Sequence, residues 1–197
     1  MKIGIFGGSF NPPHKMHKNI VRELIKKGYL NKIIIVPTAD NYNKPYLLSG
    51  IDRINMLQQL FKDDKKVEVS SFEVDGSLYT INTLNYFRKK YPKADIYFIC
   101  GTDNLAEFNR WHKFEQILSN YKLLVVDRDT NDFYKEREKY KKYKNSIYLA
   151  QISPKKISST EIRKHIMKKG FDEDIKKYLY VDTIKYLKNI NLKDFWT

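Results

Sequence analysis

The sequence predicts an α/β fold: a doubly wound parallel sheet of five to six strands, with a helical C-terminal portion. Three observations lead to this prediction. Short apolar, β-branched runs recur between segments of helical periodicity. Runs such as Ile33–Val36 and Leu123–Val126 do not alternate polar and apolar residues, which is typical of strands buried on both faces. After Ile152 the pattern is helical throughout.

Each expected strand is followed by a helical pattern, as parallel pairing requires. The predicted strands are Lys2–Phe6, Lys32–Pro37, Val67–Phe72, Asp95–Cys100, Lys122–Asp127 and Ser146–Ile152. The predicted helices are 14–28, 50–62, 80–91, 103–119, 131–143, 158–169 and 172–188, with Gly170 as the C-cap of the sixth. The chain has no repeat or Pro/Gly/Ser-rich linker. We therefore expect a single domain over 1–197, with an α/β core in 1–153 and a helical part in 154–197.

The composition indicates a globular protein of a reducing compartment. The one cysteine, Cys100, excludes an internal disulfide framework. The N-terminus lacks a signal-peptide pattern, and no apolar run approaches the ~18 residues that span a bilayer. These features predict a soluble cytoplasmic protein without membrane association, and a homo-oligomer is compatible with them.

The formal net charge of +14 has three interpretations. Basic residues can cover a solvated surface, bind nucleic acid, or attract anionic metabolites. Acidic residues interleave with the basic ones in segments such as 134–144 and 164–177, and no compact basic block forms. We therefore favour a lysine-rich solvated surface and expect no nucleic-acid partner.

The first motif follows the first predicted strand and reads Gly7-Gly-Ser-Phe-Asn-Pro-Pro-His-Lys-Met-His17. Glycines let the backbone approach a ligand closely or adopt positive φ. Residues at i and i+3 share a helix face, so His14 and His17 can address one ligand. The N-terminus of the following helix favours negative charge. The motif therefore predicts a nucleotide-phosphate site, against two alternatives: a capped helix with ordinary histidines, and a zinc site lacking nearby Cys or carboxylate ligands.

The second motif, Ile157-Ser-Ser-Thr-Glu-Ile-Arg163, has a structural and a functional interpretation. Ser158 and Glu161 fit a capping box ahead of an apolar run. The same helix N-terminus carries three hydroxyl side chains, and Arg163 follows one turn later. Arginine can bind phosphate through two hydrogen bonds, so a second anion site is predicted here.

Together the two motifs resemble the HxGH and SSTxIR signatures of the nucleotidylyltransferase superfamily. Internal segments resemble those of bacterial nicotinate mononucleotide adenylyltransferases. They are Tyr79–Leu84, similar to YTIDTL; Gly101–Leu105 with Arg110, Trp111 and Ile117; and Lys44, Pro45, Ser49, Arg53, Met56 and Leu57. The resemblance extends from Lys2 to about His165.

The resemblance implies a Rossmann-like sheet and a transfer of AMP from ATP to nicotinate mononucleotide, with pyrophosphate released. ATP and nicotinate mononucleotide would be the small-molecule partners. The implied catalytic residues are His14 and His17. The implied ATP-binding residues are Gly7, Gly8, Ser9, Phe10, Gly101, Asp103, Ile157, Ser158, Ser159 and Arg163. The implied mononucleotide-binding residues are Lys44, Tyr79, Thr80 and Trp111.

Several of these residues also have a plain structural interpretation. Trp111 can belong to the core, and Asp103 can cap the helix after Thr102. His112 and His165 are interpreted as ordinary, partly exposed residues, and Cys100 as a small apolar residue at a strand end.

The sequence departs from the family pattern at two positions. Met16 stands where the family has a glycine between the histidines, and Asn82 replaces the aspartate of YTIDTL. Neither change removes a phosphate ligand, so we expect the reaction to be retained; the changes bear on turnover and on the pyridine substrate.

Mg²⁺ is the expected cofactor, carried on the ATP phosphates with no protein ligands, because no carboxylate cluster has suitable spacing. Two rival functions remain. One is a sibling enzyme such as pantetheine-phosphate adenylyltransferase or a cytidylyltransferase. The other is a basic RNA- or nucleotide-binding module without catalysis, which would bind with strong salt dependence.

Overall fold

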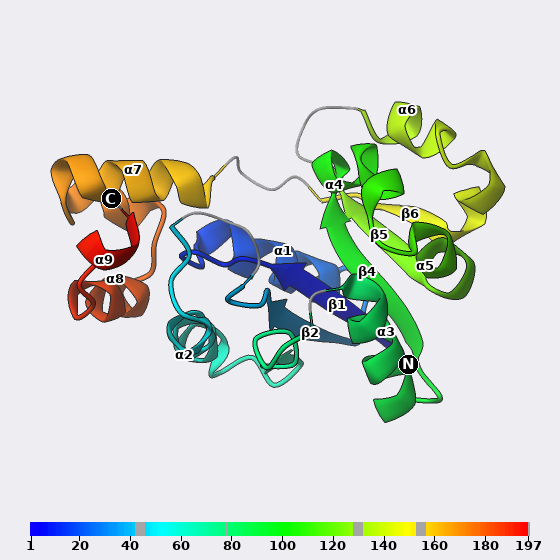
Figure 1. Cartoon of the computed structure of the whole chain (residues 1–197), viewed down its shortest axis with the longest axis horizontal. Helices are drawn as coiled ribbons and strands as arrows, with labels where there is room; N and C mark the ends of the chain where they lie inside the picture. Colours follow the sequence, from blue (N-terminus) through cyan, green and yellow to red (C-terminus); the bar gives the residue numbers. More distant parts are fainter. Residues whose placement is uncertain (42–45, 78, 128–131, 153–156, 197) are drawn as a thin grey trace.

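The computed structural model describes residues 1–41, 46–77, 79–127, 132–152 and 157–196. Over this part of the chain, six strands form one parallel sheet in the order β3-β2-β1-β4-β5-β6 (Figure 1). The strands are β1 (Lys2–Gly8), β2 (Lys32–Pro37), β3 (Val67–Val69), β4 (Asp95–Gly101), β5 (Lys122–Val126) and β6 (Ile147–Ala150). The predicted doubly wound α/β sheet is confirmed.

The α-helices are α1 (Lys15–Lys26), α2 (Gly50–Phe61), α3 (Thr80–Lys90), α4 (Thr102–Ala106), α5 (Phe114–Asn120), α6 (Phe133–Glu138), α7 (Ser159–Lys169), α8 (Val181–Lys188) and α9 (Lys193–Trp196). Three 3-10 helices accompany them: η1 (Phe108–Arg110), η2 (Lys141–Ser146) and η3 (Glu173–Lys177).

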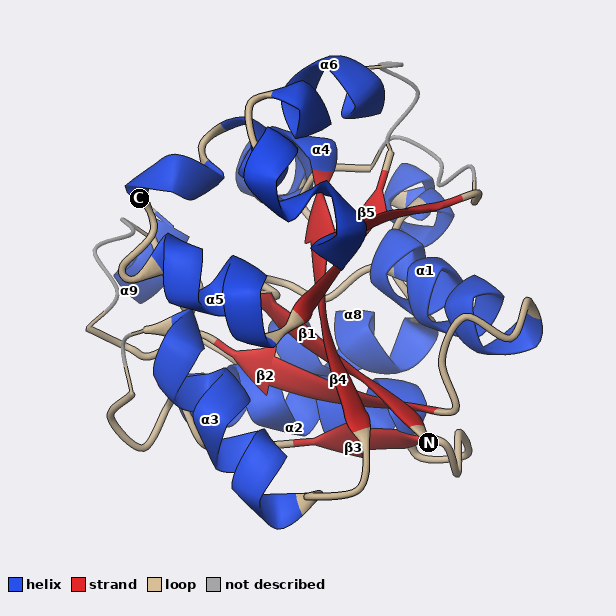
Figure 2. Cartoon of the chain, turned by 90° about the vertical axis from the view of Figure 1, so that its right-hand side faces the viewer, coloured by secondary structure: helices blue, strands red, loops and turns tan. Residues whose placement is uncertain are grey.

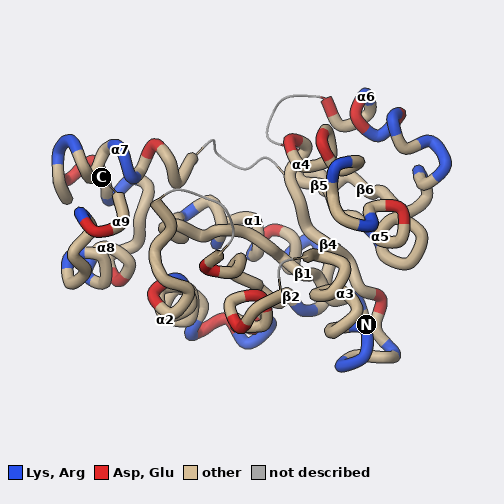
Figure 3. Tube along the Cα trace, viewed as in Figure 1, with Lys and Arg blue, Asp and Glu red and all other residues tan. Residues whose placement is uncertain are grey.

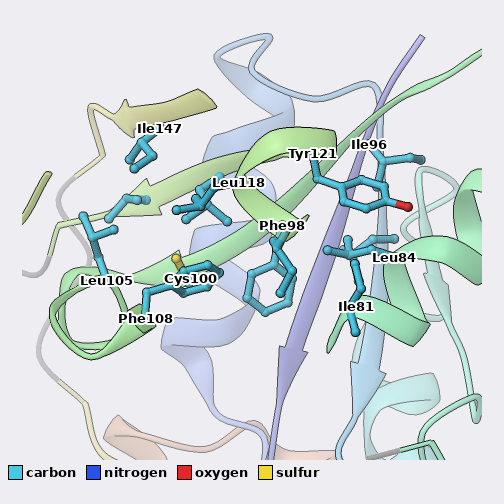
Figure 4. Close-up of a cluster of buried hydrophobic side chains, with 14 of the residues drawn as sticks. Ile81, Leu84, Ile96, Phe98, Cys100, Leu105, Phe108, Leu118, Tyr121 and Ile147 are labelled. Carbon is cyan, nitrogen blue, oxygen red and sulfur yellow. The ribbon is translucent and has the colours of Figure 1, made fainter. Parts of the chain in front are cut away.

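Apolar side chains fill both faces of the sheet, as its non-alternating strands predict. On one face, strand residues such as Ile5 and Phe98 pack against α3, α4 and α5, in the cluster of Figure 4. On the other face, Ile33 and Ile99 pack against α1 and α2. Figure 2 shows the strands between α3 and α5 on one side and α1 on the other.

The C-terminal helices have an apolar cluster of their own. Residues of α7 and α8, such as Ile162 and Leu187, pack with Met56 of α2 and with Leu48 just before it. The hydroxyl of Tyr186 in α8 lies 3.0 Å from Asp52 Oδ1 of α2. This docking places α7 beside the loops that follow β1 and β2 (Figure 1).

Three predicted helices are interrupted, and three strands are shorter than predicted. The 103–119 helix is divided into α4, η1 and α5, because Trp111 is extended and Lys113 adopts a left-handed φ of 54°. The described part of 131–143 is divided between α6 and η2, and 172–188 between η3 and α8, where Tyr180 is extended. β3 ends at Val69 rather than Phe72. β5 ends at Val126 rather than Asp127, and β6 covers Ile147–Ala150 rather than Ser146–Ile152. The predicted C-cap is confirmed at Gly170, with a φ of 71°.

Most charged residues that the structure describes lie toward the outside of the molecule; Arg53, Glu73 and Glu136 are buried. In Figure 3, lysines and arginines are spread over α7 and α8 at one end and around α6 at the other, with acidic residues between them. Among the described residues, no helix is both long and apolar enough to cross a membrane.

Candidate active site

A cleft of about 870 Å³ opens at the carboxyl ends of β1 and β4. These strands are neighbours at the centre of the sheet, where the strand order reverses direction, and such points bind ligands in open α/β sheets. The cleft is lined by every predicted site residue that the structure describes: Gly7, Gly8, Ser9, Phe10, His14, His17, Tyr79, Thr80, Gly101, Asp103, Trp111, Ile157, Ser158, Ser159 and Arg163. Lys44 lies outside the described residues.

The loop after β1 forms one wall of the cleft by close packing. A side chain at Gly7 would approach the Phe98 ring to 3.3 Å, and one at Gly8 would approach the Phe10 ring to 3.2 Å. Neither glycine has a positive φ; the left-handed residue is the buried Phe10, with a φ of 47°. The glycines therefore serve close approach, while Phe10 turns the chain.

The two histidine rings are stacked, with centroids 3.7 Å apart and planes 19° from parallel. His14 is the N-cap of α1, with an extended backbone, and its side chain is buried. His17 lies in the first turn of α1 and also packs against the edge of Phe10, at 4.9 Å between centroids. The predicted pairing of the two imidazoles at the cleft is therefore present.

A hydrogen bond determines which ring nitrogen of His17 carries the proton. The backbone N–H of His14 donates to Nδ1 of His17 over 3.1 Å. A ring nitrogen that accepts a hydrogen bond carries no proton, so the proton of the neutral ring is on Nε2. His17 therefore offers an N–H donor at the end of its ring.

Helix α7 is fastened to the loop after β1. Ser159 Oγ donates to Pro12 O over 3.0 Å, and Arg163 Nη1 donates to Asn11 O over 2.8 Å. Burial lowers the pKa of Arg163. His14, His17 and Arg163 thus border one cleft, although nearly 150 residues separate them in the chain.

The predicted capping box of α7 is wrong in one respect. Ser158 is the N-cap, but its side chain makes no capping hydrogen bond. Glu161 lies 3.4 Å from Lys164 on the exposed surface instead. Ser158 therefore lines the cleft at the N-terminus of α7 without a capping hydrogen bond from its side chain.

The end of β4 leads directly into the short helix α4. Gly101 is its N-cap, so the alternative role of Asp103 as the cap is wrong; Asp103 lies in the first turn and is exposed. Burial raises the pKa of the Cys100 thiol to about 12, so the thiol stays protonated. Cys100 is a buried apolar residue, as predicted, although it also lines the cleft.

Aromatic side chains form the opposite end of the cleft. Trp111 is half-buried, stacks on Phe108 with centroids 4.8 Å apart, and meets the edge of Phe98 at 5.6 Å. Trp111 therefore both packs in the core and lines the cleft. Tyr79, the N-cap of α3, packs on the exposed ring of His112 with centroids 4.3 Å apart. The interpretation of His112 as an ordinary residue missed its place in the cleft.

Glu73 is a further cleft residue, and it was not predicted from the sequence. This buried carboxyl group lines the cleft and accepts a 2.6 Å hydrogen bond from Thr83 Oγ1 in α3. Burial raises its pKa to about 7. In the sequence, Glu73 is simply an acidic residue shortly before the Tyr79–Leu84 segment. Nothing in its neighbourhood indicates that the side chain is buried.

The two departures from the family pattern lie away from the cleft lining. Met16 is buried in the core between α1 and the sheet, and Asn82 is exposed on α3. His165 is 2.7 Å from Asp172, outside the cleft. In the described ranges, no group of three or more His, Cys, Asp or Glu side chains could hold a metal ion.

Residues 5–165 match the family model of cytidylyltransferase-like proteins. Two relatives bear the name "Probable nicotinate-nucleotide adenylyltransferase". The one from Caldicellulosiruptor bescii is 36% identical over 198 residues, covering 98% of both chains. The one from Clostridium tetani is 34% identical over 200 residues, covering 97% of this chain and 98% of the relative. The chain belongs to the nicotinate-nucleotide adenylyltransferase family.

A solved structure supports the same fold. Plasmodium falciparum nicotinic acid mononucleotide adenylyltransferase complexed with NaAD matches with a TM-score of 0.81 at 24% identity, over 98% of each chain. The nucleotidyltransferase class predicted from the motifs is confirmed, and the comparisons give no support to the pantetheine or RNA-binding alternatives.

Proposed function

We propose that the protein transfers AMP from ATP to nicotinate mononucleotide, forming nicotinate adenine dinucleotide and pyrophosphate for NAD biosynthesis. The observation that carries the proposal is the single cleft bordered by His14, His17 and the N-terminus of α7. Membership of the nicotinate-nucleotide adenylyltransferase family supports the choice of substrates.

The substrates supply their own nucleophile. An oxygen of the mononucleotide 5′-phosphate forms a bond to the α-phosphorus of ATP, and the bond from that phosphorus to the β-phosphate oxygen breaks. The leaving pyrophosphate takes the electron pair. Such a transfer needs alignment and charge stabilisation rather than an activated side chain.

We assign the phosphates to the side of the cleft where donors converge. His14 and the Nε2–H of His17 hold the reacting phosphates and stabilise the transition state. Ser9, Phe10 and the backbone at Gly7 and Gly8 border the α-phosphate. Ile157, Ser158, Ser159 and Arg163 surround the β- and γ-phosphates, where the N-terminus of α7 adds its dipole.

The remaining cleft residues fit the nucleoside parts. Gly101 and Asp103 are assigned to the ATP ribose, because a carboxylate suits a diol. Trp111 stacks on the pyridine ring, and Tyr79 and Thr80 lie at its carboxylate, at the N-terminus of α3. Lys44, outside the described residues, is assigned to the mononucleotide phosphate by the family resemblance alone.

Mg²⁺ is assigned to the ATP phosphates. The described residues offer no cluster of three ligands, which fits an ion held by phosphate oxygens and water rather than by the protein. When bound, the ion neutralises phosphate charge; alignment stays with the side chains above. We also propose that the whole chain acts as one domain in the cytoplasm, without nucleic acid.

The test is a turnover assay. Purified protein with Mg-ATP and nicotinate mononucleotide is expected to form the dinucleotide and an equal amount of pyrophosphate. Nicotinamide mononucleotide and phosphopantetheine serve as competing substrates in parallel reactions. No product with either pyridine mononucleotide contradicts the proposal, and faster turnover of phosphopantetheine replaces it with the sibling reaction.

A further inference from the structure

Arg53 is a fully buried arginine in the middle of α2. A charge taken out of water is costly unless hydrogen bonds replace its hydration. Burial accordingly lowers the pKa of Arg53, and the Asp40 carboxylate opposes this effect. A buried cation needs a structural reason, and its hydrogen bonds supply one.

Each of the five N–H donors of the guanidinium has an oxygen within reach. Nε donates to Leu48 O at 2.9 Å. Nη1 donates to Ser9 O at 3.1 Å and to Thr38 Oγ1 at 3.5 Å. Nη2 donates to Thr38 O and to Asp40 Oδ1, both at 2.7 Å. Two loops therefore meet at one side chain: the loop after β1, and the loop between β2 and α2, which Arg53 contacts near both of its ends.

The segment before α2 forms part of the cleft. Tyr46 and Leu47 line it directly, and Leu48 follows them. Asn11 holds the same segment from the opposite side: its Nδ2 donates to Tyr46 O over 2.6 Å, and its Oδ1 accepts the N–H of Leu48 over 3.2 Å. Residues 46–48, here called the loop wall, are thus fixed between Asn11 and Arg53.

Asn11 also connects the loop wall to the opposite side of the cleft. Its carbonyl oxygen accepts the hydrogen bond from Arg163 of α7. Among the described residues, the hydrogen bonds that fasten α7 to the β1 loop come from Ser159 and Arg163 and do not involve Arg53. The loop wall, Ser9 and Thr38 are the parts of the cleft that depend on Arg53 directly.

We propose that Arg53 is a positioning residue for the cleft: it holds the loop wall in register with Ser9 and Thr38 without touching substrate. The proposal rests on the proposed function, which assigns Ser9 to the α-phosphate, where the two substrates react.

The main variant is Arg53→Lys. Lysine keeps the charge, but a single nitrogen cannot reach four separate residues. We expect kcat/KM for both substrates to fall on the order of ten- to a hundredfold, because small misplacements around reacting groups have effects of this size.

The matched control is Leu57→Ala in the same helix. Leu57 is fully buried on the sheet side of α2, and its side chain forms no hydrogen bond with either loop, so its truncation weakens the fold without releasing the loop wall. Both variants are assayed at a temperature where circular dichroism shows them folded. An equal fall of kcat/KM in the two variants overturns the proposal.

If Arg53→Lys fails to fold, a second variant and a second measurement still test the proposal. Asp40→Ala removes one half-exposed acceptor, and a two- to fivefold fall in kcat/KM is expected; no change overturns the proposal. Hydrogen exchange at the Leu48 amide, measured relative to amides of β1, is expected to be faster in Arg53→Lys than in Leu57→Ala. This readout needs no turnover, so absence of turnover in the unsubstituted protein contradicts the proposed function, while unchanged exchange contradicts the role of Arg53.

Discussion

His17 illustrates how a single hydrogen bond fixes a side chain for chemistry. Its Nδ1 accepts the backbone N–H of His14, and its ring is stacked between His14 and the edge of Phe10. The ring therefore points its Nε2–H in one direction before any ligand arrives. Preorganised donors of this kind stabilise the charge that develops in a transition state.

Substitution of His17 tests this role. His17→Asn keeps an oxygen near the position of Nδ1 but removes the distal N–H, so kcat is expected to fall by roughly 10²-fold or more with the fold retained. His17→Ala is expected to lose at least as much. His165→Ala, outside the cleft, is the control and is expected to leave kcat unchanged. Steady-state kinetics with thermal melts provide the measurement, and unchanged turnover in His17→Asn would remove Nε2 from the mechanism.

Trp111 is both a core residue and a cleft residue. One face stacks on Phe108 and one edge meets Phe98, which leaves it half-buried. Trp111→Ala is expected to weaken mononucleotide binding by about 1–3 kcal/mol, the usual contribution of stacking on a base, and ATP binding far less. Calorimetric Kd values for both ligands provide the check, with Trp111→Phe as the conservative control. Equal weakening for both ligands would show that the tryptophan acts only in packing.

At the level of elements, the turn before α3 is joined to that helix by the buried pair of Glu73 and Thr83. The pKa of Glu73 is raised from 4.5 to about 7 by burial. Between these two values the unfolded chain has released this proton and the folded chain has kept it. The free energy of unfolding therefore falls as the pH rises through this window, by about 3 kcal/mol in total.

Glu73→Gln is expected to remove this pH dependence. Glutamine keeps an oxygen that accepts from Thr83 but cannot ionise, so the variant gains stability relative to the original protein above pH 7 and little below pH 4.5. Urea denaturation at several pH values gives the comparison. The exposed Glu107→Gln serves as control. Parallel pH profiles for Glu73→Gln and the original protein would show that the carboxyl group ionises normally.

The elements show where sequence reasoning succeeds and where it fails. All six strands were predicted because apolar, non-alternating runs have one simple explanation in an α/β chain. The break between α4 and α5 was not predicted, because residues 107–113 contain no glycine or proline. Packing of Trp111 on Phe108 and Phe98 accompanies that break, and such tertiary contacts override local helical preference.

The same limit applies to the site. Short motifs identified the histidines, the β1 loop and the N-terminus of α7, because their residue types are unusual together. Glu73, His112 and the loop wall carry no such signal; only the folded chain brings them to the cleft. The role of Arg53 was hidden for another reason, since its five acceptors are mostly backbone oxygens, which every residue possesses.

For the whole molecule, the strand order β3-β2-β1-β4-β5-β6 decides where the site lies. The sequence indicated a parallel sheet but not this order, which depends on how each crossover folds back. With β1 and β4 adjacent, the loops after them face one another, and the C-terminal helices dock on α2 to bring α7 across.

The fastening of α7 to Asn11 and Pro12 has a consequence for synthesis of the protein. A ribosome builds the histidine loop within its first moments, whereas Ser159 and Arg163 emerge only when four-fifths of the polypeptide has been made. A nascent chain can thus complete its central strands and still lack one side of the proposed triphosphate pocket. Under the proposed function, a product truncated before Ser159 would lack residues that bind the β- and γ-phosphates and would be inactive.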